Sequence, residues 1–238
     1  MLEHLNYSTI NTIDCLKKTQ YHINKTETNK PKPPVLQTGI DMHNIADIYM
    51  KTGDVGPLPY KTDLHELHWK NLEPYLFKWK RDLLSSEQKI YTNHPIPLDG
   101  ILDLLLEDYT IIDYKFTNKP WTDRKANDYI SKQAWIYFEL VKAQYGVYPK
   151  KLIYAVFPAE GQIKLHTVLF DNAKLSTAYK LWKDSWGIIK QAEEENSFPA
   201  SPTNWRCNYC PYSSICSDSA ARLSLNMPDR PKWGGNAV

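Results

Sequence analysis

Acidic and basic side chains near the middle of the chain have the types and spacing of a metal-dependent phosphodiesterase centre. Asp103 closes the segment Gly100–Asp103, and Asp113–Lys115 follows after an apolar stretch and the acidic turn Glu107–Tyr109. A hairpin around this turn would pair Asp103 with Asp113 on one face, ~5 Å apart at Cβ, with Lys115 on the same face. Two carboxylates this close repel each other unless a cation lies between them. Oxygen ligands of this kind favour Mg²⁺ or Mn²⁺.

Taken alone, the same hairpin also fits a surface turn whose charged side chains face solvent. The chain has 238 residues, of which 42% are hydrophobic and 24% charged, as in an ordinary globular protein. Its net charge is only +2, so a site for a polyanion must be a local basic patch. Two segments offer such a patch, although a solvated surface explains either one. The first contains Lys115, Lys119, Arg124, Lys125 and Lys132, and the second contains Lys17, Lys18, Lys25, Lys30 and Lys32.

The first residues of the chain bear on its location. Met1–Tyr7 lacks the apolar stretch of a secretion signal, and no apolar run approaches the length of a membrane span. We therefore expect a cytoplasmic protein that does not enter a membrane. Cysteines in that compartment stay reduced, so they are available as metal ligands.

All four cysteines can be placed in one ligand set. Three form Cys207-x2-Cys210-x5-Cys216, and Cys15 lies near the other end of the chain. Four thiolates hold either a structural Zn²⁺ ion or an iron–sulfur cluster. Zinc sites usually use two local pairs, so the three-plus-one spacing favours a cluster that would join the two chain ends. Four unrelated free cysteines are the remaining alternative.

Hydrophobic periodicity and chain breakers predict helices, then strands, a helix, two strands and a last helix. Helices are expected at 7–24, 39–50, 63–84, 123–145 and 175–194, and strands at 89–93, 96–106, 110–116, 151–157 and 164–170. This order predicts a mixed α/β core. Gln133 and Tyr137 are four residues apart, so they lie on one face of the fourth helix.

Several of these features, in this order, resemble the RecB-type branch of the PD-(D/E)XK nuclease superfamily. They are Cys15, His43, Gly100-x2-Asp103, Asp113-Tyr114-Lys115, Gln133-x3-Tyr137 and the C-terminal cysteine triplet. With Cys15 included, the chain is similar to the iron–sulfur members of that branch, the CRISPR-associated RecB-like exonucleases and the AddB-type nuclease domains. The resemblance extends over residues 5–218.

The resemblance implies a restriction-endonuclease-like fold, in which helices flank a central mixed sheet, within a single nuclease domain at 1–238. Residues 1–84 would form a helical region that carries the first cluster cysteine. The nuclease core would occupy 85–195, the cluster-binding segment 196–218 and a tail 219–238.

Roles for individual residues also follow from the resemblance. A Mg²⁺ or Mn²⁺ ion is expected at His43, Asp103, Asp113 and the carbonyl of Tyr114. Lys115 is expected to orient or activate the attacking water, and Gln133 and Tyr137 to position the lysine and the nucleic-acid strand. A 4Fe-4S cluster is expected at Cys15, Cys207, Cys210 and Cys216.

Two of these choices had competitors in the sequence. His65, His68 and His94 also precede the acids, but Gly39–His43 matches the family's Gly-x3-His pattern at a helix start. Glu87 is left out of the metal set because Ser85–Glu87 also fits a helix cap or a loop.

The resemblance thus implies a Mg²⁺- or Mn²⁺-dependent deoxyribonuclease, chiefly an exonuclease on single-stranded DNA ends, with endonuclease activity as an additional expectation. Its setting would be DNA end processing, recombination and repair, or CRISPR spacer acquisition, with protein partners from such a complex, in a cell or a virus-infected host. Two alternatives stay open. One is a non-catalytic module that binds DNA ends or docks a partner, and the other is a zinc-stabilised nucleic-acid-binding protein.

Overall fold

A computed structural model describes residues 1–28, 34–56, 62–202, 207–208 and 210–219 of the chain. These residues belong to two compact units. The larger unit contains His4–Tyr7 and Lys32–Lys183, and the smaller one contains Met1–Glu3, Ser8–Pro31 and Asp184–Val238. The expected tail lies outside the described residues except for Ser219, and the expected single domain stays a prediction.

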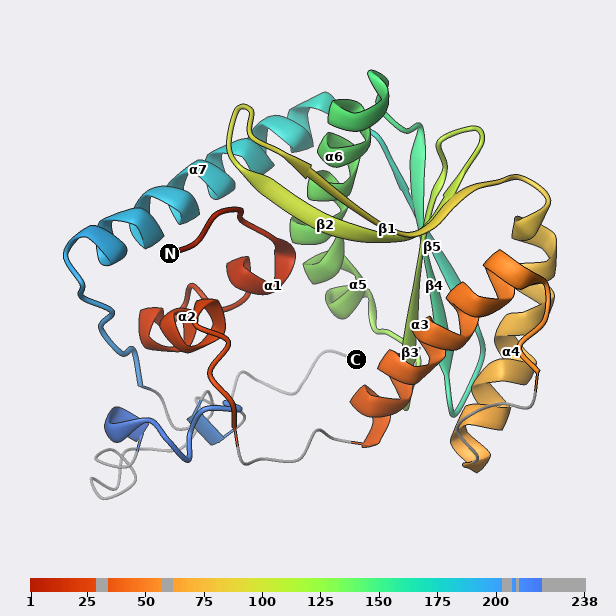
Figure 1. Cartoon of the computed structure of the whole chain (residues 1–238), viewed down its shortest axis with the longest axis horizontal. Helices are drawn as coiled ribbons and strands as arrows, with labels where there is room; N and C mark the ends of the chain where they lie inside the picture. Colours follow the sequence, from red (N-terminus) through yellow and green to blue (C-terminus); the bar gives the residue numbers. More distant parts are fainter. Residues whose placement is uncertain (29–33, 57–61, 203–206, 209, 220–238) are drawn as a thin grey trace, which may run out of the picture. The chain divides into compact units, whose positions relative to one another are not determined.

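The larger unit is built on a five-stranded sheet in the order β1-β2-β3-β4-β5, as Figure 1 shows. The strands are β1 Leu83–Thr92, β2 Leu98–Leu106, β3 Ile111–Thr117, β4 Lys151–Pro158 and β5 Lys164–Leu169. β3 and β4 pair in parallel, whereas the other neighbours are antiparallel. A parallel pair requires a crossover connection, which the helices between β3 and β4 provide. The predicted mixed α/β class with a helix-flanked sheet is therefore confirmed.

Helices cover both faces of this sheet (Figure 1). α3 Pro34–Thr52 and α4 Asp63–Lys80 lie on one side, and α5 Asp123–Tyr129, a π-helical turn at Ile130–Ala134 and α6 Trp135–Tyr145 lie on the other. α7 Asn172–Glu194 begins in the larger unit and ends in the smaller one. Within the described residues, no helix has both the length and the apolar character that crossing a membrane requires.

The core between α3, α4 and the sheet explains why these helices form. Their buried apolar residues recur at helical spacing and meet alternate residues of the central strands. Thr62 caps α4 by accepting a hydrogen bond from the amide of His65, and α6 ends at Gly146, which adopts a left-handed φ of +77°. The buried core includes Met42, Ile45, Tyr49, Leu72, Leu76, Trp79, Leu104, Ile112, Tyr114 and Phe157.

The smaller unit joins residues from the two ends of the sequence. Lys190 donates a hydrogen bond from Nζ to the carbonyl of Leu2 at 2.6 Å, and the amide of Lys17 donates to the carbonyl of Pro199 at 3.2 Å. Its N-terminal part contains α2 Leu16–Ile23, and its C-terminal part contains the end of α7 and the segment that carries the cysteine triplet.

The predicted helix at 7–24 proved to be two helices, α1 Tyr7–Ile10 and α2. The hydroxyl of Thr12 donates to the carbonyl of Thr9 at 2.7 Å, and such local bonds compete with helix continuation. Cys15 therefore lies outside a helix, at the N-cap of α2, in an extended conformation with φ of −149°.

Three further boundaries differ from the sequence prediction. α3 begins at Pro34, five residues before Gly39, because proline fits the first turn of a helix. α4 runs through Pro74 and ends at Lys80, and β1 begins at Leu83. Residues 85–87 therefore lie in a strand rather than in a cap or loop. The first half of this strand is polar, so hydrophobic alternation did not reveal it; β1 lies at the edge of the sheet, where most of its side chains are only partly buried.

Two histidines of α4 are buried away from the acids. His65 contacts Asp41 with 3.2 Å between Nε2 and Oδ2. His68 has no exposed surface, and neither of its ring nitrogens has a hydrogen-bond partner among the described residues. Its ring lies against Phe116, with 5.2 Å between ring centroids. Burial, and to a smaller extent the charge of His65, lower the pKa of His68 from 6.5 to about 4.

We expect His68 to make stability depend on pH. Between pH 4 and 6.5 the unfolded state binds a proton at His68 and the folded state does not, so stability should fall as pH falls. The loss from pH 6.5 to 4.5 should reach ~2 kcal/mol, since each unit of pKa difference corresponds to ~1.4 kcal/mol. Urea unfolding should show a flatter profile for His68→Leu, whereas the exposed His94→Leu should keep the full slope.

Candidate metal centre and cysteine pocket

Three side chains from separate elements converge in the larger unit. His43 of α3 lies 3.3 Å from both Glu87 of β1 and Asp103 of β2, measured from its Nδ1 to Oε1 and Oδ1 respectively. One ligand atom from each residue lies within 4.8 Å of the other two. A nitrogen and two carboxylate oxygens at this spacing form a donor set for a divalent cation.

The end of the ladder between β2 and β3 positions Asp103. Leu104 pairs with Ile112 and Leu105 with Ile111, which is the register predicted for the hairpin. Beyond these pairs, Oδ2 of Asp103 accepts a hydrogen bond from the backbone amide of Tyr114 at 2.8 Å. The side chain thus takes the place of a ladder contact, and its other oxygen is left to face His43.

Glu87 is the residue of this group that the sequence analysis weighed and left out of the metal set. It lies between the pairs Ser86↔Leu104 and Gln88↔Leu102, so it stands opposite Asp103 in the β1–β2 ladder. Its φ of +44° is uncommon outside glycine, and such backbone strain concentrates at functional sites. The sequence prediction began this strand at residue 89. A start several residues earlier would have placed Glu87 opposite Asp103 in the ladder.

The pKa of His43 shows that the carboxylates of Asp103 and Glu87 attract positive charge. Burial opposes a charge on the ring, but Asp103 and then Glu87 outweigh burial and raise the pKa of His43 to about 10. The two carboxylates therefore hold a proton on the imidazole, as they would hold a cation. A metal ion in this position would replace that proton.

Asp113 and Lys115 form a buried pair on the next strand. Oδ1 of Asp113 lies 2.5 Å from Nζ of Lys115. The carboxylate has no exposed surface, and its Oδ2 has no hydrogen-bond partner among the described residues. Burial raises the pKa of Asp113 despite the nearby ammonium, and Asp113 raises the pKa of Lys115 despite burial. An unpartnered buried oxygen next to Asp103 fits a metal ligand.

Gln133 and Tyr137 lie close enough to these acids for the charges of Asp113 and Asp103 to act on Tyr137. Nε2 of Gln133 donates to the hydroxyl of Tyr137 at 2.9 Å, and Oε1 of Gln133 is buried without a partner in the described part of the chain. Burial and then the charges of Asp113 and Asp103 raise the pKa of Tyr137. A Cβ on Gly100 would come within 3.2 Å of the Tyr137 ring, so glycine in β2 lets the helix approach closely.

The π-helical turn is a feature that periodicity did not predict. It occupies Ile130–Ala134, inside the expected continuous helix at 123–145. Turns of this kind are often found at functional sites because one extra residue re-aims the side chains around it. Here it contains Gln133 and leads directly into the turn of α6 that carries Tyr137.

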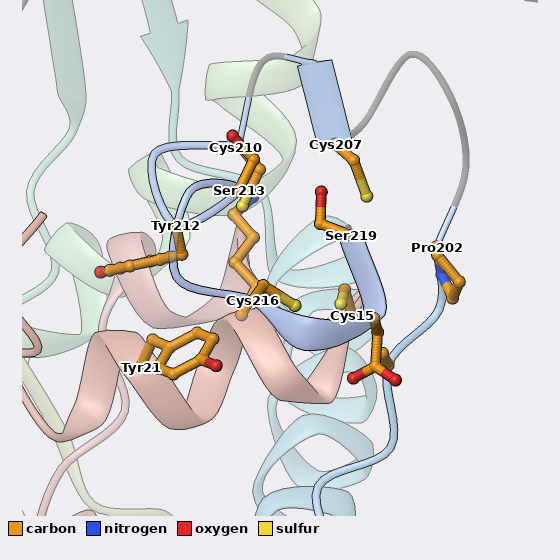
Figure 2. A pocket seen from close by; sticks show the side chains of 12 residues that line it. Cys15, Tyr21, Pro202, Cys207, Cys210, Tyr212, Ser213, Cys216 and Ser219 are labelled. Atoms are coloured by element: carbon orange, nitrogen blue, oxygen red, sulfur yellow. The ribbon is translucent and has the colours of Figure 1, made fainter. Parts of the chain in front are cut away.

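The four cysteines line a single pocket in the smaller unit, which Figure 2 shows from close by. None of the four forms a disulfide within the described residues, and each is of intermediate exposure. The backbone amide of Ser201 donates to Sγ of Cys15 at 3.5 Å, and burial raises the pKa of Cys210 although the Tyr212 backbone opposes this. Amide donors aimed at sulfur stabilise bound thiolates. Cys15, Cys207, Cys210 and Cys216 thus line one pocket, and their role as cluster ligands stays a prediction.

The sequence model of the PD-(D/E)XK nuclease superfamily matches residues 20–217. The chain belongs to this superfamily. The sequence Asp113-Tyr114-Lys115 fits the (D/E)XK part of the superfamily's name, and Asp103 as the preceding acid stays a prediction. Superfamily members use divalent metal ions, and the group formed by His43, Glu87 and Asp103 offers a site for one.

Two of three similar solved structures have TM-scores that support this fold. A proposed exonuclease from Eubacterium rectale has a TM-score of 0.62 at 12% identity, over 96% of this chain and 90% of its own. The structure of SSO0001 has a TM-score of 0.50 at 18% identity, over 92% and 88%. A phage-related exonuclease from Haemophilus somnus 129PT has a TM-score of 0.41 at 11% identity, over 82% and 96%. No curated protein sequence matches the chain.

We predict that Glu87 contributes to metal affinity. Glu87→Gln keeps the shape of the side chain but removes a negative charge beside Asp103, so Mn²⁺ should bind about tenfold more weakly. Titration calorimetry on the purified protein measures this. Glu73→Gln, an exposed glutamate of α4, is the matched control and should leave Mn²⁺ affinity unchanged. Equal affinities for the Glu87→Gln variant and the unmodified protein would exclude Glu87 from the centre.

Proposed function

We propose that this PD-(D/E)XK protein is a Mg²⁺- or Mn²⁺-dependent deoxyribonuclease that degrades DNA from single-stranded ends. The observation that carries the proposal is the convergence of His43, Glu87 and Asp103 next to the buried pair of Asp113 and Lys115. The chain thus combines the donor set of a cation with a fixed positive charge. Hydrolysis of a phosphodiester requires both.

In this proposal Asp103 and Asp113 hold the metal ion together with His43, Glu87 and the carbonyl of Tyr114. A bound Mg²⁺ or Mn²⁺ ion would supply Lewis acidity and lower the pKa of a water molecule. The amide of Tyr114 keeps Asp103 in a fixed orientation through the 2.8 Å hydrogen bond.

Lys115 has the second role. Its ammonium is held by Asp113 at 2.5 Å, and the raised pKa keeps it protonated at neutral pH. A fixed cation at this point stabilises the negative charge that develops on the phosphoryl oxygens. Gln133 and Tyr137 pack behind the acids, where their mutual hydrogen bond restricts the rotamers available to both.

We further propose that the protein belongs to the RecB-like branch and that the four cysteines hold a 4Fe-4S cluster. Support comes from their common pocket and from the three-plus-one spacing, which a zinc site of two local pairs does not have. Such a cluster would stabilise the smaller unit by linking Cys15 to the C-terminal triplet.

The proposed substrate and setting rest on the same resemblance. A single-stranded DNA end is the expected substrate, within end processing, recombination and repair, or CRISPR spacer acquisition. Exonuclease action is expected to dominate over internal cleavage. The partners in this proposal are DNA and the proteins of such a complex.

A nuclease assay tests the activity. Labelled single- and double-stranded DNA should be degraded with Mg²⁺ or Mn²⁺ and should stay intact with EDTA. Asp113→Ala and Lys115→Ala should each lower the rate at least ~100-fold, because each removes a charge that acts on the transition state. Lys78→Ala, an exposed lysine of α4, should retain the full rate.

If Asp113→Ala degrades DNA as fast as the unmodified protein, the proposed mechanism is wrong. If the unmodified protein binds DNA but no metal ion supports cleavage, the chain is a docking module rather than an enzyme.

Anaerobic purification tests the cluster. The protein should be brown and contain iron and acid-labile sulfide, whereas a zinc protein would be colourless. Cys15→Ala should lose iron and unfold at a lower temperature, because the fourth ligand connects the chain ends. Ser213→Ala, which changes the same pocket without removing a thiol, should keep its iron. Full iron content and stability in Cys15→Ala would rule out ligation by Cys15.

A further inference from the structure

A groove of about 450 Å³ adjoins the metal centre, and its lining has two chemical halves. His43, Glu87 and Lys115 line one part of it. The other part is apolar and is formed by Val35, Leu36, Ile40, Phe116 and Tyr129. The charged half belongs to the centre described above, but the proposed chemistry gives no role to the apolar half.

The apolar half contains side chains that are unusually exposed for their type. Leu36 is 53% exposed and Ile40 is 38% exposed. They are four residues apart on α3, so they form a stripe that continues to Asn44, which also lines the groove. Ile48 follows on the same stripe at 45% exposure but does not line the groove. Large apolar side chains gathered at a concave site usually contact a ligand.

The chemistry of the two halves specifies the occupant. A phosphate at the charged half must be bonded through its sugar to a base, and the base is the flat apolar part of a nucleotide. A groove of this size accepts one such group, in the range of ordinary small-ligand sites. A base inside a duplex is stacked and paired, so it cannot enter the groove while its phosphate reaches the centre.

We propose that Leu36 and Ile40 of α3, with Tyr129 of α5, form a subsite for one unpaired nucleobase of the strand whose phosphate lies at the metal centre. Tyr129 is held for this contact by Trp121, with parallel rings 4.5 Å apart. Its ring also lies 5.6 Å from Nζ of Lys115, which connects the base subsite to the charged half of the groove. Sequence tolerance follows, because every base has an apolar face. The proposal rests on the proposed nuclease function and identifies why that site would select a single strand.

The test compares a normal single-stranded oligonucleotide with one of equal length that consists of abasic nucleotides. Binding is measured by fluorescence anisotropy with Mg²⁺ in an Asp113→Asn background, which prevents cleavage from confusing the result. Leu36→Ala and Ile40→Ala should each weaken binding of the normal oligonucleotide about tenfold, the loss of one buried apolar side chain. Both should bind the abasic oligonucleotide as the background protein does. Ile48→Ala, from the same stripe, should change neither affinity.

Alanine favours helices and all three sites are exposed, so these variants should fold normally. Equal weakening for the normal and abasic strands would overturn the proposal, as would no weakening for either. The cleavage assay gives an independent result. If the unmodified protein cleaves nothing yet Leu36→Ala loses base-dependent binding, the proposed activity fails and the subsite stands.

Discussion

The candidate site depends on the point where the ladder between β2 and β3 stops. Up to Leu104 and Ile112 the two strands pair in the ordinary way, and one residue further the carboxylate of Asp103 bonds to the amide of Tyr114. A side chain that replaces a backbone partner is fixed as firmly as the sheet itself. Asp103 can therefore face Glu87 on one side and His43 on another without the freedom of a surface acid. The fixed carboxylate of Asp103 thus sets where the other side chains of the centre must lie.

Electrostatic frustration is the second property of the centre. Asp113 is fully buried and Asp103 nearly so, and among the described residues their negative charges are balanced by Lys115 and a protonated His43. Burial of like charges costs free energy unless cations and hydrogen bonds offset it. The buried charges are confined to one part of β2 and β3. The side chains of Leu104 and Tyr114, on the same two strands, belong instead to a continuous apolar core. Along β2 and β3, residues of the charged centre, such as Asp103 and Asp113, therefore alternate with residues of the stabilising core, such as Leu104 and Tyr114.

Sequence reasoning recovered the parts of this arrangement that local spacing encodes. The alternation of Asp113 and Lys115, the four-residue step from Gln133 to Tyr137 and the spacing of the C-terminal cysteine triplet each follow from short-range geometry, whereas Cys15 joined that set through the count of four cysteines and the family resemblance. Glu87 could not be found in that way, because its role arises from cross-strand register and from a backbone with positive φ. The break before Cys15 was missed for a related reason. The spacing of apolar residues carries no information about the hydroxyl of Thr12, which competes for the backbone carbonyl of Thr9.

The composition of the smaller unit has a consequence for biosynthesis. It combines Ser8–Pro31 with Asp184–Val238, whereas the sheet and its flanking helices lie almost wholly in between. During translation the first cysteine emerges about 190 residues before the triplet, a delay of roughly 10 to 40 s at ordinary elongation rates. The sheet with its acids can therefore fold while Cys15 is still an exposed, unpartnered thiol. The cysteine pocket can close only once Cys207, Cys210 and Cys216 have been synthesised, which is after all five strands, and a chain truncated before the triplet would carry the acidic centre without that pocket.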